Sequence, residues 1–271
     1  MTSNTNPPVA SAAPEFTILH REAHRLLKFN RIDRDMNWVR GLITINLAAS
    51  EMPSAALAFP CVMTHGPSGG RLLAVAGLEQ GRNLFVDGKG HWLGDYLPAV
   101  LRTWPFRLLD KEDEEGARPI AVQREALSVS LGDALFDDKG QEMPWLKAVM
   151  QDLVALDAGE TTTSEMVNAL HAAGVLTERA LQAVLPNGRQ MELTGFLSVD
   201  EHKLNALEDK VVADLHRQGA LAMAYLHLLS LRKFKDLMEL AAAHEPVEEP
   251  QAAASAPVAT SQSTAKEKSA S

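Results

Sequence analysis

Two histidine-containing motifs have residue types that could do chemistry, and neither has the full pattern that the chemistry needs. His20 and His24 in HREAH have the spacing of zinc ligands on a helix, but Glu22 between them matches neither H-E-x-x-H nor H-x-x-E-H. Cys61 precedes His65 by four residues, yet it lies in the apolar run FPCVM, which favours a buried thiol over a nucleophile. The sequence therefore predicts no metal site and no catalytic residue here.

A third group, His227 and Ser230 in AYLHLLSLRKF, interrupts an otherwise apolar stripe at helical spacing. Buried polar groups that hydrogen-bond to backbone are the favoured interpretation. The alternative is an enzyme or a metal-dependent small-molecule binder, in which His227 and Glu201 meet His24 or His91. Ser198 and Glu201 have the S-x-x-E spacing of a capping box, which predicts a helix start there.

The segment Gly81–Phe106 contains glycines, a lysine and aromatic residues, and invites comparison with a phosphate-binding loop. It fails the G-x-x-x-x-G-K-[ST] pattern in glycine spacing and in the final hydroxyl residue, so no cofactor is predicted. We predict a hairpin from Asn83 to about Trp92 around the turn Asp87–Gly90, a helix from Asp95 or Tyr96 to Arg102, and a return to a strand at Trp104–Phe106.

The elements that must position these residues differ between the two halves of the chain. Short apolar runs separated by Gly, Pro and Asp dominate up to residue 143, and apolar residues three and four apart dominate after it. We expect an α+β fold, with a β-rich region at 15–143 packed against a helical region at 144–244 that contains one hairpin. Residues 1–14 and 245–271 are predicted to be disordered because their composition cannot bury a core.

Three turn sequences support hairpins in this fold. GRNLFVDGKG and GDALFDDKGQ share the pattern G-x-x-L-F-x-D-x-x-G, which places an apolar pair before an Asp- and Gly-rich turn. A third turn, Pro186–Arg189, contains Asn-Gly, which readily adopts the positive φ of a tight hairpin.

Charge and hydropathy exclude two classes of partner. The net charge is −9 and no basic stripe is present, which argues against nucleic acid and against an anionic membrane surface. The longest nearly apolar run, Ala220–Leu231, is too short to span a bilayer, so no membrane insertion is expected. The single cysteine and the lack of a signal-peptide pattern predict a cytoplasmic protein.

A series of segments then resembles one bacterial family in order and spacing. They are NLFVDGKGHW, YLPAVLRTWPF, LFDDKG, LPNGRQMELTGFLSVDEHKLNAL and YLHLLSLRKF. This series is similar to the SapC family over nearly all of Phe16–Leu240. The resemblance implies a role beside surface-layer protein secretion and supplies no defined catalytic residue set.

The resemblance also selects candidate binding positions. The aromatic residues among them could form a recognition surface, and Arg102 could offer a planar fork to a carboxylate. The segment that holds them could equally form the seam between the two halves of the chain. The candidates are Asn83, Trp92, Tyr96, Arg102, Phe106, Glu201, His227 and Ser230. We therefore expect a non-enzymatic accessory or binding protein with an envelope- or secretion-related protein partner, while its oligomeric state stays open.

Overall fold

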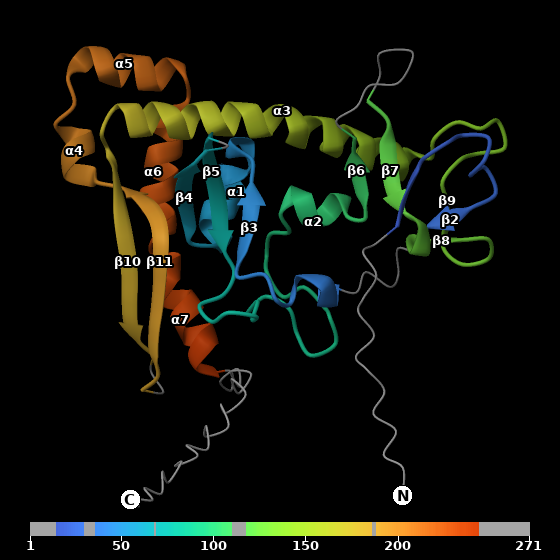
Figure 1. The fold of residues 1–271 in the computed structure, drawn as a ribbon, viewed down its shortest axis with the longest axis horizontal. Coiled ribbons are helices and arrows are strands. Elements are labelled where there is room, and N and C mark those ends of the chain that lie inside the picture. The colour runs from blue at the N-terminus through green and yellow to red at the C-terminus, as the bar shows by residue number, and fades with distance from the viewer. Residues whose placement is uncertain (1–14, 30–35, 68, 110–117, 186–187, 244–271) are drawn as a thin grey trace, which may run out of the picture.

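The computed structural model describes residues 15–29, 36–67, 69–109, 118–185 and 188–243 (Figure 1). The two segments expected to be disordered, 1–14 and 245–271, lie outside the described residues. The division at residue 144 also stays a prediction. The expected α+β class is confirmed, with antiparallel sheets mostly in the N-terminal part and helices mostly after residue 143.

The main sheet has five antiparallel strands in the order β10-β11-β4-β5-β3. Their bounds are β3 Thr44–Leu47, β4 Cys61–Gly66, β5 Gly69–Val75, β10 Leu176–Val184 and β11 Gln190–Val199. The apolar runs of the N-terminal part thus form strands as expected. The hairpin of the C-terminal part joins the same sheet, where β11 meets β4 at Leu197 and Met63.

Two small sheets lie at the other end of the molecule (Figure 1). The first has the order β1-β7-β6, with β1 Phe16–Ile18, β6 Phe106–Leu108 and β7 Ile120–Gln123. The second has the order β8-β2-β9, with β2 Lys28–Phe29, β8 Leu127–Ser128 and β9 Asp133–Ala134.

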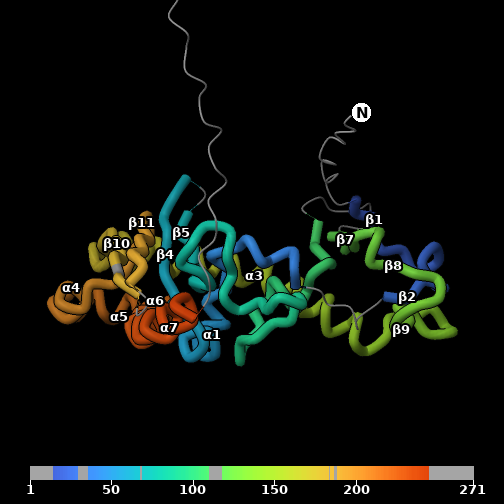
Figure 2. The backbone as a smooth tube through the Cα atoms, turned by 90° about the horizontal axis from the view of Figure 1, so that it is seen from below, coloured from blue at the N-terminus to red at the C-terminus, as the bar shows by residue number. Residues whose placement is uncertain are grey.

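Seven α-helices and three short 3-10 helices occur in the described residues. The α-helices are α1 Met52–Ala58, α2 Ala99–Thr103, α3 Pro144–Ala172, α4 Glu201–Asn205, α5 Asp209–Arg217, α6 Ala220–Ser230 and α7 Lys233–Ala243. The 3-10 helices are η1 Met36–Val39, η2 Ala49–Glu51 and η3 Arg124–Ala126. Helices α1, α6 and α7 gather on one side of the main sheet (Figure 2).

Helix α3 joins two separate apolar cores. Its first half contributes Leu146 and Leu153 to a small core that also holds Phe29 and Phe106. Its second half contributes Val167 and Leu170 to the large core of the main sheet. Gly70 on β5 allows this contact, because a Cβ there would overlap the side chain of Val167. The 29-residue helix therefore fixes one core against the other.

The two L-F-x-D-x-x-G segments form the same turn, which confirms the sequence echo. Oδ1 of Asp87 accepts hydrogen bonds from the backbone N–H groups two and four residues later, and Oδ1 of Asp137 does the same. The glycine three residues after each aspartate, Gly90 or Gly140, has φ of 83° or 74°, which a side chain would disfavour. The glycines serve the turn, as expected.

Two local predictions need adjustment. The helix expected from residue 95 or 96 begins later, at Ala99, and Pro98 is the residue before it. The capping box predicts a helix that starts directly after Ser198, but α4 begins at Glu201 and Ser198 does not cap it. Asp200 is the cap, because its side chain accepts from the N–H groups of the second and third helical residues. Ser198 instead lies in β11 and has another partner.

Candidate functional site

A cavity of about 350 Å³ lies at the seam between the two cores. One wall belongs to the edge of the main sheet around Leu47 and Leu72, and another to β6 at Phe106. Helix α3 closes the third side with Leu153 and Leu156. The volume is in the range of ligand pockets and the lining is chiefly apolar, so the seam cavity suits an apolar group.

Aromatic rings continue from the seam cavity onto the surface. Trp104 lines the cavity and stacks on Trp38 with 4.4 Å between ring centroids. Trp38 is 39% exposed. The edge of the group is formed by Phe16, whose ring meets Trp104 at 6.0 Å and lies 3.8 Å below the guanidinium of Arg107. We call Phe16, Trp38, Trp104 and Arg107 the aromatic rim.

Charges around the seam cavity are unequally compensated. Asp157 lines it and forms an ion pair with Arg118. Arg71 and Glu160 also line it, and neither forms an ion pair within the part of the chain that the structure describes. With Arg107 on the rim, two cations face one unpaired carboxylate, which favours a partner that carries negative charge beside its apolar group.

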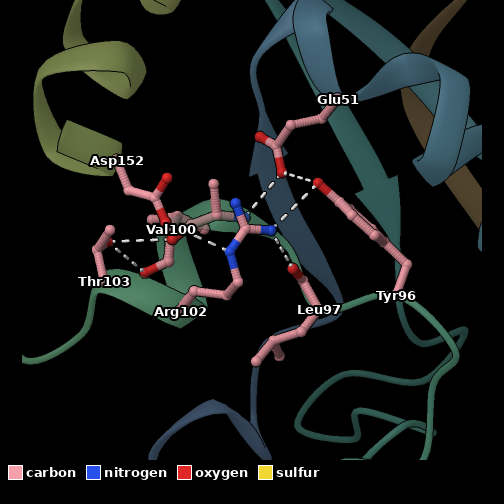
Figure 3. A network of polar contacts seen from close by, with 8 residues as sticks. Glu51, Tyr96, Leu97, Val100, Arg102, Thr103 and Asp152 are labelled. Atoms are coloured by element: carbon pink, nitrogen blue, oxygen red, sulfur yellow. Dashed lines mark hydrogen bonds and ion pairs between the residues drawn. The ribbon is translucent and has the colours of Figure 1, made fainter. Parts of the chain in front are cut away.

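A buried carboxylate holds α2 against the start of α1 beside this cavity (Figure 3). Glu51 is 7% exposed, and its Oε1 accepts hydrogen bonds from the Tyr96 hydroxyl at 2.7 Å and the Ala99 N–H at 2.8 Å. Its Oε2 accepts from the Ala48 N–H at 2.9 Å. Three donors compensate the buried charge, so Glu51 fixes the geometry of the seam rather than reacting there.

Tyr96 and Arg102 extend this network toward α3 (Figure 3). Arg102 donates to the Leu97 carbonyl at 2.9 Å and to the Tyr96 hydroxyl at 3.5 Å, and its Nε lies 3.6 Å from a carboxylate oxygen of Asp152. Burial, together with the hydrogen bond to Glu51, raises the pKa of Tyr96 to about 12. Burial lowers the pKa of Arg102, but Tyr96 and the nearby carboxylates more than offset it, and the pKa rises. Both groups therefore stay protonated at neutral pH.

His227 and Ser230 form a second polar cluster inside the large core. The Nδ1 of His227 lies 2.8 Å from the Cys61 carbonyl, while Nε2 accepts from the Val199 N–H at 3.1 Å and lies 3.0 Å from the Ser198 hydroxyl. Ser230 accepts from the Cys61 N–H and donates to the His227 carbonyl. Burial lowers the pKa of His227 to about 4 and raises that of the Cys61 thiol to about 12. The cluster fastens α6 to β4 and β11.

The structure brings some of the predicted binding residues together and leaves others apart. Trp92 joins Tyr96 and Arg102, because its Nε1 donates to the Tyr96 carbonyl at 3.0 Å. Phe106 lines the seam cavity. Asn83 is buried and accepts from a backbone N–H two residues later, so it belongs to a turn. Glu201 is exposed at the start of α4, and its side chain forms no hydrogen bond or ion pair within the described residues.

The residues of the alternative metal or enzyme site do not converge. His227 is fully buried in α6, and His91 is exposed and bonded to Asp87. Helix α4, which begins at Glu201, lies at one end of the molecule, and β2, which follows His24, lies at the other (Figure 1). Within the described residues no group of three His, Cys, Asp or Glu side chains is placed to hold a metal ion.

Sequence reasoning missed several residues of the seam. Glu51 gave one usable signal, because an acidic residue directly before Met-Pro at a helix start is well placed to accept backbone N–H groups. Trp104 was assigned only to a returning strand, although it bridges the cavity and the rim. Asp152 had no signal, since its partner Arg102 lies fifty residues earlier in the chain.

Fold and site together define an α+β protein in which one long helix spans two cores and a lined cavity lies between them. A model of the SapC family matches residues 19–237. The match covers most of the chain, so the protein belongs to the SapC family. No curated protein and no solved structure gave a match. No helix in the described parts of the chain is long and apolar enough to cross a membrane.

Proposed function

We propose that the protein is a non-catalytic accessory protein that holds an apolar, negatively flanked segment of a protein partner in the seam cavity. The observation that carries the proposal is the continuity between the cavity and the aromatic rim through Trp104. The seam cavity alone would suit a small apolar molecule, but the aromatic rim adds an exposed surface that a larger partner can contact. Exposed tryptophan and arginine next to a pocket are the residues that most often dominate protein–protein binding energy.

The other family-pattern residues support a binding role through what they do inside the protein. His227 and Ser230 hold helix to sheet, and Tyr96 and Arg102 set the position of α2. Val100 and Thr103 of α2 line the cavity. A cavity wall that is fixed by a buried network is preorganised, which lowers the entropy lost when a partner binds.

The setting of this role comes from the family alone. The match gives the family alone. We extend to this chain the role that the sequence resemblance implies, a place beside surface-layer protein secretion, as handling of envelope or secreted proteins. A cytoplasmic location is part of the same proposal. Arg71, which has no ion pair among the described residues, and Arg107 on the rim favour partner segments in which acidic residues flank an aliphatic or aromatic one.

Photo-cross-linking from inside the cavity tests this proposal. A photoreactive phenylalanine analogue replaces Leu156, which lines the cavity, or Leu131, which is 65% exposed away from it, in the full chain in its own host. We expect covalent adducts with a protein from position 156 only, and their loss when Val100→Arg places a charge in the cavity. Equal adducts from both positions, or adducts that survive Val100→Arg, would contradict the proposal, as would a turnover that Arg102→Ala abolishes.

A further inference from the structure

Strand β10 is a long, open edge of the main sheet (Figure 1). It has nine residues and β11 is its one neighbour within the described residues. In an antiparallel ladder, alternate residues point their N–H and C=O groups toward one side, so about half of the β10 residues point theirs outward. None of these outward groups has a hydrogen bond inside the described chain.

The opposite edge of the sheet is protected, whereas β10 is not. β3 has only four residues, and α2 packs beside it. β10 carries no proline, no lysine and no bulge of its own. The ladder irregularity near Ala180 puts the extra residue in β11, where Gly195 has φ of 77°. The charged residues of β10 are Glu178 and Arg179, which are neighbours of opposite sign. A regular edge of this length is a template for another strand.

We propose that β10 pairs antiparallel with β10 of a second copy, so that two main sheets join edge to edge around a two-fold axis. The axis would be perpendicular to the sheet, so corresponding faces of the two sheets would lie on the same side of the joined sheet. Residues that oppose each other must then lie on the same face, so the two numbers differ by an even amount. Only a few registers satisfy this condition.

The register centred on Ala180 satisfies it best. Ala180 then faces its own copy, and all nine residues find a partner. Leu176 opposes Val184, which is 66% exposed in the single chain, and Glu178 opposes the amide of Gln182. The first is an apolar pair. In the second, the Gln182 amide donates one N–H to Glu192 at 3.0 Å and has its other N–H for Glu178, and pairs of both kinds stabilise neighbouring strands.

Shifted registers are worse for a physical reason. Centring the contact on Glu178 or on Arg179 places one charge directly opposite its own copy, which is destabilising. Centring it on Leu181 leaves only residues 178–184 paired. In the favoured register Arg179 opposes Leu181 and keeps its ion pair with Asp200 at 3.6 Å. Length and charge therefore match β10 to itself better than a slipped pairing does.

Strand pairing alone buries less surface than a standard protein interface, so the dimer forms only at high protein concentration. Sedimentation equilibrium of the full chain up to about 1 mM measures it. We expect a monomer–dimer equilibrium that Ala180→Lys or Ala180→Glu alone shifts at least about tenfold toward monomer. Ala158→Lys, which places the same charge on an exposed residue of α3, is the matched control and leaves the equilibrium unchanged.

Mixing the two charged variants makes the test specific for self-contact at one residue. Because residue 180 of one copy meets residue 180 of the other, Ala180→Lys mixed with Ala180→Glu restores a dimer. Circular dichroism of each variant checks that it is folded. A wild type that is monomeric over the whole range, a dimer that survives Ala180→Lys, or a mixture that stays monomeric would overturn the proposal.

A disulfide reports the same contact by an independent route. Opposed residues in antiparallel strands have Cα atoms about 4.5 or 5.5 Å apart, within the range that a disulfide spans. Ala180→Cys should therefore form a covalent dimer in air, while Ala158→Cys should not. The native Cys61 is buried and does not compete. Equal cross-linking of the two variants, or none at position 180, would contradict the register.

Discussion

The polar cluster around His227 predicts a specific loss of stability in acid. The unfolded chain takes up a proton on this imidazole near the ordinary pKa of 6.5, but the folded protein does so only near pH 4. Protonation therefore favours the unfolded state throughout that window, and stability falls as the pH falls from 6.5 to 4. At 1.36 kcal/mol per pKa unit the full loss is about 3 kcal/mol, of which about 2.5 kcal/mol is reached at pH 4.5.

The substitution His227→Gln isolates this contribution. Glutamine is uncharged at every pH and can still accept from the Val199 N–H, but it loses the hydrogen bond to the Cys61 carbonyl. We expect the free energy of unfolding of the variant to be about 2 kcal/mol lower than that of wild type at pH 7.5. This difference should shrink to near zero at pH 4.5, because only the wild type loses stability through this residue.

Urea denaturation of wild type and His227→Gln at half-unit steps from pH 7.5 to 4.5 is the measurement. Asp87 and Asp200 have lowered pKa values, each first because of a backbone hydrogen bond to its carboxylate, and they weaken both proteins alike in acid. Their effect cancels in the difference. His216→Gln, which removes an exposed histidine on α5, is the control. A wild-type-minus-variant difference that is constant across this range would refute the assignment of a buried, neutral His227.

Three further predictions concern stability and reactivity. Glu51→Gln leaves one of three buried donors without an acceptor and should lower the free energy of unfolding in urea by about 2–3 kcal/mol. The control Glu160→Gln, at an exposed residue, should change that free energy by less than about 0.5 kcal/mol. Equal effects of the two substitutions would contradict the network. Gly70→Ala crowds α3 and should lower stability by about 1–3 kcal/mol, while Gly41→Ala, with nothing within 4 Å of a new Cβ, should not; thermal melts of the two variants decide. Cys61, whose pKa burial raises to about 12, should react with a thiol reagent at pH 8 only at the rate of unfolding, and fast labelling of the native protein would show that the thiol is accessible.

Local patterns predict the paired turns and the helical half of the chain, but the hairpin expected around Asp87 has only one isolated bridge, Val86–Trp92, in place of two strands. The paired L-F-x-D-x-x-G segments gave the two turns because an aspartate side chain and a left-handed glycine act within five residues. Apolar spacing from Pro144 onward predicted helical structure there, although not that a single helix continues to Ala172. The buried roles of His227 and Cys61 also followed from their apolar neighbours in the chain.

The seam could not be predicted because it is built from long-range contacts. Arg102 meets Asp152, and Trp104 meets both Trp38 and Phe16, across separations that no periodicity encodes. The capping error has a similar origin. Ser198 matched a local capping pattern, but β11 extends to the next residue and Asp200 takes the cap position. At Ser198 the strand pairing of β11 therefore overrides the local capping pattern.

The polar clusters around His227 and Glu51 lie in different places, but each connects a helix to a neighbouring element. His227 links α6 to both β4 and β11, which meet at one residue pair only, so the side chain supplies hydrogen bonds that the short ladder lacks. Glu51 links α1 and α2 across the seam, where no ladder exists. Each cluster therefore lies where few backbone hydrogen bonds connect the neighbouring elements. The architecture accounts for the polar family-pattern residues at these contacts, whereas the exposed rings of the aromatic rim have no such structural role in our proposal and serve the partner instead.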